Sequence, residues 1–209
     1  MKSDYLYRRR VFDLRVLTAM RCATFDFEAY RSIADLERRQ SRVTDPAAGA
    51  TVTKYRWIFR IPTHISRDHF APETELFVNT DVPDYPREPP DIWILSNHVP
   101  WSPHFRRNAP VCIAPELWVP TGGHITLGDL AIHIAHLLNW HEEGRGRDYV
   151  GWNPAAIEHH WKRYHGRPIN PDLRYPSLPR WLAGERPAKS SFQNMNPAAR
   201  PDPGFRILR

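Results

Sequence analysis

Proline most constrains what this chain can fold into, because it accounts for 21 of the 209 residues and has no backbone N–H to donate. Five prolines lie between His98 and Pro120, where no apolar periodicity is found. Such a stretch suits neither a helix interior nor a central strand, so we expect a long ordered loop. Long ordered loops in compact domains usually carry function, which makes this segment the first place to look for chemistry.

Three short strands are expected before this loop. In Lys54–Ile61, large apolar side chains alternate with Lys and Arg, which predicts one buried and one exposed face. Glu75–Asn79 and Asp91–Leu95 are two more apolar runs, separated by a proline-rich stretch. Because successive strands usually pair with each other, an antiparallel meander is expected. Residues 25–43 alternate only briefly and leave strand and helix both open.

Three helices are indicated by apolar spacings of three and four residues and by capping signals. The first covers Tyr7–Met20; its apolar stripe consists of Tyr7, Val11, Leu14, Leu17 and Met20, and its opposite face of Arg8, Arg9, Asp13 and Arg15. The second lies within Ile125–Trp140, has an apolar stripe from Leu127 to Leu138, and is started by Thr126 with Asp129. The third begins after Asn153-Pro154 and runs to Tyr164. Helices beside an antiparallel sheet make an α+β domain.

The positive charge is concentrated at the C-terminus. The chain has a formal net charge of +6, and the segment from Trp161 onward carries 10 Lys and Arg against 3 acidic residues. We therefore expect a globular domain over residues 1–164 and a basic, proline-rich extension over 165–209. A basic tail can bind an acidic protein face as well as phosphate, and a protein partner ranks above nucleic acid.

Part of this extension is apolar and is expected to be ordered. Leu173, Tyr175, Leu178 and Trp181 should pack on the domain or on a partner, whereas residues beyond Lys189 should be mobile.

Composition predicts a cytoplasmic protein. No run approaches the ~18 to 20 apolar residues of a membrane span, and the charged N-terminus lacks the apolar stretch of a signal peptide. The two cysteines, Cys22 and Cys112, can supply neither a disulfide framework nor a four-cysteine zinc site. Cysteine chemistry in this chain must therefore rest on single thiols.

Cys112 is the foremost candidate for chemistry because it lies in the long loop. A thiolate is both a nucleophile and a good leaving group, so a cysteine thioester holds an acyl group in a form that an amine can attack. The competing interpretation is a small buried hydrophobic residue, which is the commonest state of a free cysteine and the one expected for Cys22.

Two other kinds of site compete with this interpretation. His133, His136 and His141 lie near one another in sequence, but no carboxylate or cysteine completes a metal-ligand set at useful spacing. A cysteine hydrolase would use Cys112 with His104, His159 or His160 as the base. Such enzymes commonly place the nucleophile at a helix N-terminus. The sequence around Cys112 does not have the pattern of a helix start.

The stretch from Glu75 to Leu138 resembles the ubiquitin-conjugating (UBC) enzyme family. Two strands flank a Tyr-Pro-x-x-Pro-Pro signature at Tyr85–Pro90, and Ser102-Pro103-His104 occupies the place of the family's His-Pro-Asn motif, eight residues before Cys112. The segment from Asn108 to Ile113 resembles the active-site segment, and Trp118-Val119-Pro120 matches the Trp-x-Pro that follows it.

The resemblance implies a UBC-like fold and a carrier that holds a ubiquitin-like protein as a thioester on Cys112. Its partners would be that protein, a ubiquitin-activating-type enzyme and an acceptor protein with an amine; no cofactor or metal is implied. His104 replaces the family's asparagine, and a histidine there can donate a hydrogen bond to the oxyanion or act as a base.

The arginine-rich composition and the divergent motifs suggest a bacterial member of the kind found in antiviral defence operons. The alternative function is a catalytically inactive UBC-like module that binds a ubiquitin-like protein or its activating enzyme. In that case Cys112 would be incidental.

Overall fold

The computed structural model describes residues 2–83, 85–113, 118, 125–141 and 152–183. Met1–Pro179 forms one compact unit and Arg180–Arg209 a second, in which the short helix α6 (Arg180–Ala183) is described. All other described elements belong to the first unit. Among the described helices, none is both long and apolar enough to cross a lipid bilayer.

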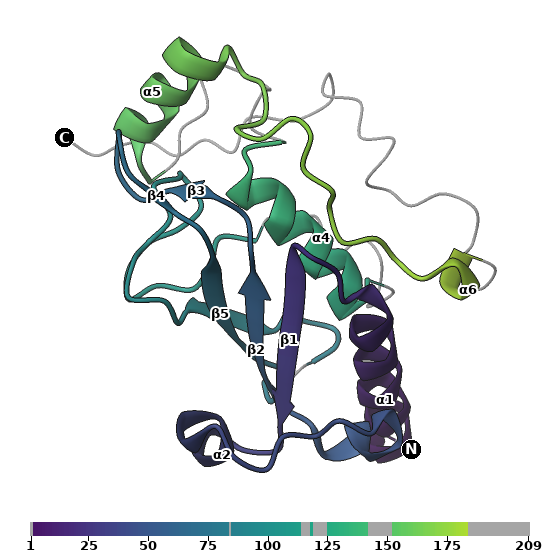
Figure 1. The fold of residues 1–209 in the computed structure, drawn as a ribbon. Coiled ribbons are helices and arrows are strands. Elements are labelled where there is room, and N and C mark those ends of the chain that lie inside the picture. The colour runs from purple at the N-terminus through teal and green to yellow at the C-terminus, as the bar shows by residue number, and fades with distance from the viewer. Residues whose placement is uncertain (1, 84, 114–117, 119–124, 142–151, 184–209) are drawn as a thin grey trace. The chain divides into compact units, whose positions relative to one another are not determined.

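A four-stranded antiparallel sheet forms the centre of the first unit (Figure 1). Its strands lie side by side in chain order: β1 (Phe25–Tyr30), β2 (Lys54–Phe59), β5 (Thr74–Asn79) and β6 (Asp91–Ile94). The predicted meander is therefore confirmed, and the undecided residues that begin at Phe25 supply a further strand at its edge. Between β2 and β5 the chain forms a small second sheet from β3 (Thr63–His64) and β4 (Phe70–Ala71).

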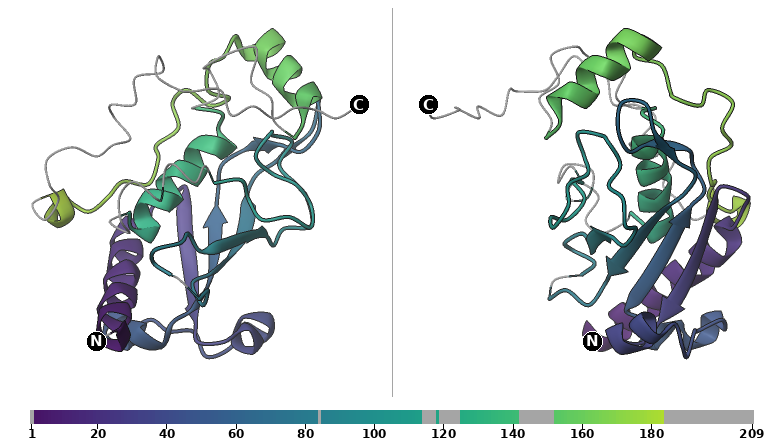
Figure 2. Two further views of the ribbon diagram at one scale, coloured as in Figure 1. Left: turned by 180° about the vertical axis from the view of Figure 1, so that it is seen from behind. Right: turned by 60° about the vertical axis from the view of Figure 1, so that its left-hand side comes forward.

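One face of the main sheet is apolar and carries the core. The register brings Phe27, Trp57, Leu76 and Ile94 into one row across the four strands. Helix α4 (Leu127–Leu138) lies against the face turned away from the viewer in Figure 1, as the view from behind shows (Figure 2). Burying large aromatic side chains under a helix supplies most of the driving force for such a domain.

The other face of β2 is less exposed than the alternation predicts. Arg56 is only 9% exposed because β2 is an interior strand with neighbours on both sides. Its guanidinium bonds to Glu75 through Nε at 2.8 Å and to Glu28 through a terminal nitrogen at 3.0 Å. Three strands are thereby linked by one arginine.

Helix α1 (Lys2–Met20) contains the predicted helix, but two of its polar residues lie inside the protein. Leu14, Leu17 and Met20 are buried as expected, whereas Tyr7 is 52% exposed. Arg9 and Asp13 were placed on the exposed face by their spacing; they are buried and form an ion pair, with Arg9 Nε 2.7 Å from Asp13 Oδ2. Spacing assigns a residue to a face but does not show what covers that face.

Four further helical segments begin at side-chain caps. Helix α4 begins at the predicted capping box of Thr126 and Asp129, and α5 (Pro154–Tyr164) begins after Asn153, whose side chain accepts from the Ala156 N–H. Between β1 and β2 lie α2 (Ile33–Arg38) and the 3₁₀ helix η1 (Pro46–Thr51), capped by Ser32 and Asp45. Each cap satisfies an N–H that the first helical turn leaves without a partner.

The segment after α5, up to Pro179, packs on the rest of the first unit. The Thr24 hydroxyl donates to the Arg174 carbonyl at 2.7 Å, and the Asn139 side chain donates to the Tyr175 hydroxyl at 2.6 Å. Leu173, Tyr175 and Leu178 are partly buried, as expected. Trp181, in the second unit, is 42% exposed, so its packing on a partner stays a prediction. The expected mobility beyond Lys189 concerns residues outside those described.

Candidate functional site

The loop after β6 is held by backbone hydrogen bonds at three points. The Trp101 N–H donates to the His64 carbonyl in β3 at 2.6 Å, and the Val111 N–H donates to the Ile92 carbonyl in β6 at 2.7 Å. The Cys112 N–H donates to the His104 carbonyl at 3.1 Å. A loop with five prolines cannot form a regular ladder, so these separate bonds fix its course.

Cys112 is a free, exposed cysteine at the end of this anchored segment. The residue before it, Val111, is buried and bonded to β6, which positions the backbone of Cys112 while its side chain meets solvent. An accessible thiol on a positioned backbone is what nucleophilic chemistry requires.

Cys22 is also free and exposed, and the expectation that it is a small buried residue is wrong. It lies two residues after the end of α1, and its sulfur lies 3.3 Å from the Thr24 hydroxyl oxygen. Exposure therefore does not distinguish the two thiols; their surroundings do.

His104 and Cys112 are brought together through their backbones. The carbonyl of His104 accepts from Cys112, and its own N–H donates to the Ser102 hydroxyl at 3.3 Å. His104 is partly buried. The seven residues between the two positions thus close into a loop, and His104 lies beside the thiol-bearing residue.

The other two histidines considered as bases belong to α5. His160 stacks on Trp140 with ring centroids 4.2 Å apart, and its Nε2 lies 2.9 Å from the Arg167 carbonyl oxygen. Burial lowers its pKa to about 4, so it is neutral at pH 7. His159 packs against Trp101 at 5.3 Å and His64 at 5.4 Å. Both rings have packing partners within the aromatic cluster around α5.

No motif in the sequence indicates that α5 supports the candidate site. The Trp152 N–H, just before the helix, donates to the Pro103 carbonyl at 3.2 Å, and the Arg106 guanidinium lies 5.9 Å from the centre of the Trp152 ring. With the contact between His159 and Trp101, these contacts join α5 to the segment that contains His104. The abundance of Trp and His in these segments was the only available signal.

The proline signature is anchored from two sides. Trp118 is 1% exposed, and its indole N–H donates to the Pro86 carbonyl at 3.0 Å. The Tyr85 hydroxyl donates to Asp13 in α1 at 2.6 Å, and burial raises the pKa of Tyr85. Trp118 thus packs against the proline signature through a buried indole. Trp101 is partly buried against the small cluster around Trp140.

The histidines of α4 have aromatic partners. His136 stacks on His141 with ring centroids 4.7 Å apart and meets the Tyr175 ring edge-on at 4.3 Å. Among the residues that the structure describes, no three His, Cys, Asp or Glu side chains are grouped so as to hold a metal ion.

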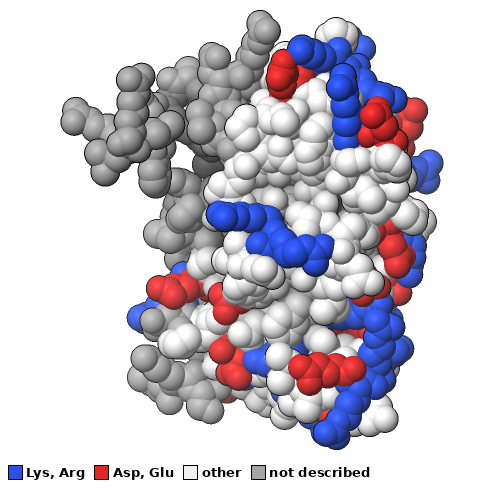
Figure 3. Space-filling model, turned by 90° about the vertical axis from the view of Figure 1, so that its left-hand side faces the viewer, with Lys and Arg blue, Asp and Glu red and all other residues white. Residues whose placement is uncertain are grey.

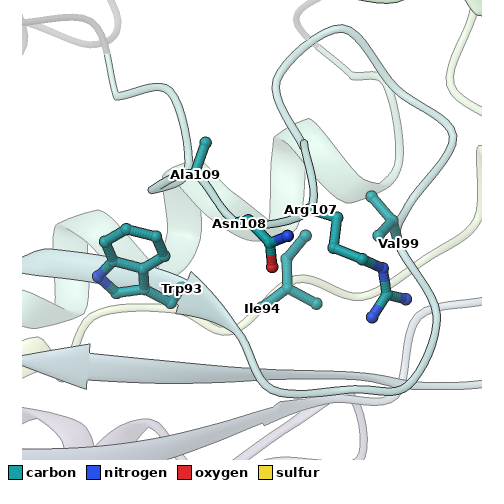
Figure 4. A pocket seen from close by; sticks show the side chains of 6 residues that line it. All are labelled: Trp93, Ile94, Val99, Arg107, Asn108 and Ala109. Carbon is teal, nitrogen blue, oxygen red and sulfur yellow. The ribbon is translucent and has the colours of Figure 1, made fainter.

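A small pocket opens beside the candidate site, between β6 and the following loop (Figure 4). Its volume is about 100 Å³, and it is lined by Trp93, Ile94, Val99, Arg107, Asn108 and Ala109. In Figure 4, Asn108 and Ile94 lie between the Trp93 ring and the Arg107 guanidinium. Asn108 has a φ of 60°, in the left-handed region that asparagine tolerates better than most residues. No motif in the sequence predicts this pocket.

Comparisons of the chain with models of protein families, with curated proteins and with solved structures found no match.

Proposed function

We propose that this protein is a ubiquitin-conjugating-type carrier with a UBC-like fold, in which Cys112 holds a ubiquitin-like protein as a thioester. The Cys112 thiolate attacks the C-terminal carbonyl of that protein on its activating enzyme, a new C–S bond forms, and the enzyme's thiol leaves. An amine of the acceptor then attacks the carbonyl. The C–N bond forms as the C–S bond breaks, the amine loses a proton, and Cys112 leaves as a thiolate.

The observation that carries this proposal is the exposed sulfur of Cys112 on a backbone bonded to both β6 and His104. Two large proteins have to reach the sulfur in turn, so it must be open to solvent. A fixed backbone reduces the entropy lost when the reacting groups meet. The order of elements also supports the proposal: a helix, a meander sheet, a long loop with the cysteine, and a helix packed on the sheet.

His104 is proposed to act on the thioester as a hydrogen-bond donor. Its carbonyl accepts from the Cys112 N–H, so the two residues are neighbours. A neutral imidazole donates one hydrogen bond, which can stabilise the oxyanion that forms when the amine attacks. The side chain takes the place of the asparagine found in the family that the sequence resembles.

Thiol exchange tests the proposal without knowledge of the natural partner. The probe is ubiquitin bearing a C-terminal thioester of 2-mercaptoethanesulfonate, incubated with the protein and examined on a non-reducing gel. We expect a band of added mass that disappears on treatment with thiol and is absent in Cys112→Ala. Cys22→Ala is the matched control, because it removes the other exposed thiol and should leave the band unchanged.

His104→Ala separates loading from transfer. We expect its thioester to form but to discharge onto free lysine about 10²-fold more slowly than the wild-type thioester, as for the loss of one oxyanion donor. Equal loading of Cys112→Ala and the wild type would overturn the proposal. It would favour the inactive module that binds ubiquitin-like proteins without a thioester.

A further inference from the structure

The pocket beside Cys112 lies in a strongly basic part of the chain. From Ile92 to Pro115 the sequence contains no Asp or Glu, while Arg106 and Arg107 stand side by side. Arg107 donates to the Asn97 carbonyl. Among the described residues, no carboxylate lies within ion-pair distance of Arg106 or Arg107. A guanidinium has five N–H donors in a planar fork that matches a carboxylate, so Arg107 retains donors for a partner.

The surrounding surface supports this local excess of positive charge. Figure 3 shows a group of basic side chains with mostly uncharged residues around it and acidic side chains below it and along the right-hand edge of the view. Since residues 92–113 include no Asp or Glu, the field of Arg106 and Arg107 is not cancelled by acidic neighbours in their own segment. An anionic group is therefore favoured there over a neutral or cationic one.

The other wall of the pocket is aromatic. Trp93 is 36% exposed, and Leu95, two residues later, is 38% exposed. Tryptophan and arginine are the residues that most often anchor protein interfaces. A volume of about 100 Å³ is well below the ~300 Å³ at which cofactor sites begin, and it suits a single side chain.

We propose that the pocket between Trp93 and Arg107 binds an acidic side chain from a peptide segment of a partner protein, while an apolar neighbour of that side chain packs on the Trp93 ring. The carboxylate pairs with the Arg107 guanidinium, and the Asn108 amide supplies a further donor. This recognition needs no thioester, so it stands or falls separately from the proposed function of Cys112.

The bound segment would lie beside the thiol. Ala109 lines the pocket and precedes Cys112 by three residues, so the rim lies within about 10 Å of the Cys112 backbone. The pocket is thus placed to select which protein surface is presented to Cys112.

Peptide binding to the full-length protein tests the proposal. The probe is a blocked pentapeptide with four aspartates around one phenylalanine, and the comparison peptide carries asparagine in place of each aspartate. Amide and indole resonances in ¹H–¹⁵N spectra report the binding. We expect the acidic peptide to shift the resonances of residues 93–94 and 107–109, and the asparagine peptide to bind at least fivefold more weakly.

Two neighbouring arginines provide the matched variants. Arg107→Gln should weaken binding of the acidic peptide about fivefold, whereas Arg106→Gln, which removes the same charge outside the pocket lining, should weaken it less than twofold. Trp93→Leu should weaken binding of the acidic peptide that contains phenylalanine. The same substitution should not weaken binding of the acidic peptide in which alanine replaces that phenylalanine. Thermal unfolding of each variant shows that the fold is retained.

Three results would overturn the proposal. The first is equal affinity of the protein for the aspartate and asparagine peptides. The second is an equal loss of affinity for the aspartate peptide in Arg106→Gln and Arg107→Gln. The third is tighter binding of an eight-nucleotide oligothymidylate than of the peptide at the same residues, which would assign the surface to nucleic acid.

Discussion

Asp13 is a fully buried carboxylate that three parts of the chain contact. It accepts hydrogen bonds from Arg9 in the same helix, from the Tyr85 hydroxyl at 2.6 Å and from the Leu127 N–H at the start of α4 at 3.0 Å. A buried charge is tolerated only when such donors replace its lost hydration. One residue therefore sets the positions of α1, the proline signature and α4 relative to one another.

Asp13→Asn should destabilise the protein by about 3 kcal/mol, because it leaves Arg9 buried without its counter-charge. Denaturation by urea at pH 7 measures this free energy. Asp4→Asn is the control: it breaks the equally spaced pair with Arg8, which is exposed, and should cost less than about 0.5 kcal/mol. A similar loss of unfolding free energy in both variants would show that the buried Asp13 pair does not stabilise the protein more than the exposed Asp4 pair.

Several neutral histidines lie in the contacts of helix α5. The His64 ring bonds to the Tyr164 hydroxyl at 2.8 Å, and His160 bonds to the Arg167 carbonyl. Burial lowers the pKa of His64, His159 and His160. Within the described structure, His159 Nε2 and His160 Nδ1 are buried without a hydrogen-bond partner, so a proton added there has no acceptor.

Stability should therefore fall as the solution becomes acidic. The pKa of His160 is 6.5 when unfolded and about 4 when folded, so the unfolded chain binds more protons between these values. This histidine alone should remove about 2 kcal/mol of unfolding free energy between pH 7 and pH 5. Urea denaturation at the two pH values measures the loss.

The phenylalanine variant of the same residue isolates its contribution. His160→Phe retains the stacking on Trp140 but does not titrate, so the loss between pH 7 and pH 5 should shrink. His69→Phe changes an exposed histidine and serves as the control substitution. The prediction is wrong if His160→Phe loses as much stability on acidification as the unaltered protein.

At the scale of the whole molecule, the segment after α5 closes the first unit. The Ile169 N–H donates to the Asn139 carbonyl at 3.0 Å, and the Asn170 N–H donates to the Asn139 side chain at 2.8 Å. Asn139 is fully buried at the end of α4. Together with the bonds of Arg174 and Tyr175, these contacts satisfy polar groups that would otherwise be buried without partners.

Shortening the chain tests this closure. A chain that ends after Tyr164 should unfold at a temperature at least about 5 °C lower than the full chain, since it loses several buried hydrogen bonds. A chain that ends after Pro179 keeps the first unit and should unfold within about 2 °C of the full chain. Calorimetry measures both; equal melting of the two shortened chains would contradict the prediction.

Local patterns in the sequence determined the elements. The capping box at Thr126 and the Asn153-Pro154 pair mark the starts of α4 and α5, because capping involves atoms only a few residues apart. The alternation in β2 and the prolines after β6 likewise predict a strand and an irregular loop, and they placed Cys112 in that loop. These features depend on neighbours in sequence, so sequence is sufficient to find them.

Contacts between distant residues were decided by the tertiary structure. Spacing put Arg9 and Asp13 on the face opposite the apolar stripe, and the commonest state of a free cysteine suggested a buried Cys22. Arg9 and Asp13 are buried and Cys22 is exposed, because burial depends on what packs over a position. The bond between Cys112 and His104, the contact of α5 with the loop and the pocket between Trp93 and Arg107 arise only when the chain folds back on itself. Local rules fix periodicity and caps, whereas long-range packing fixes which groups meet and which remain open to a partner.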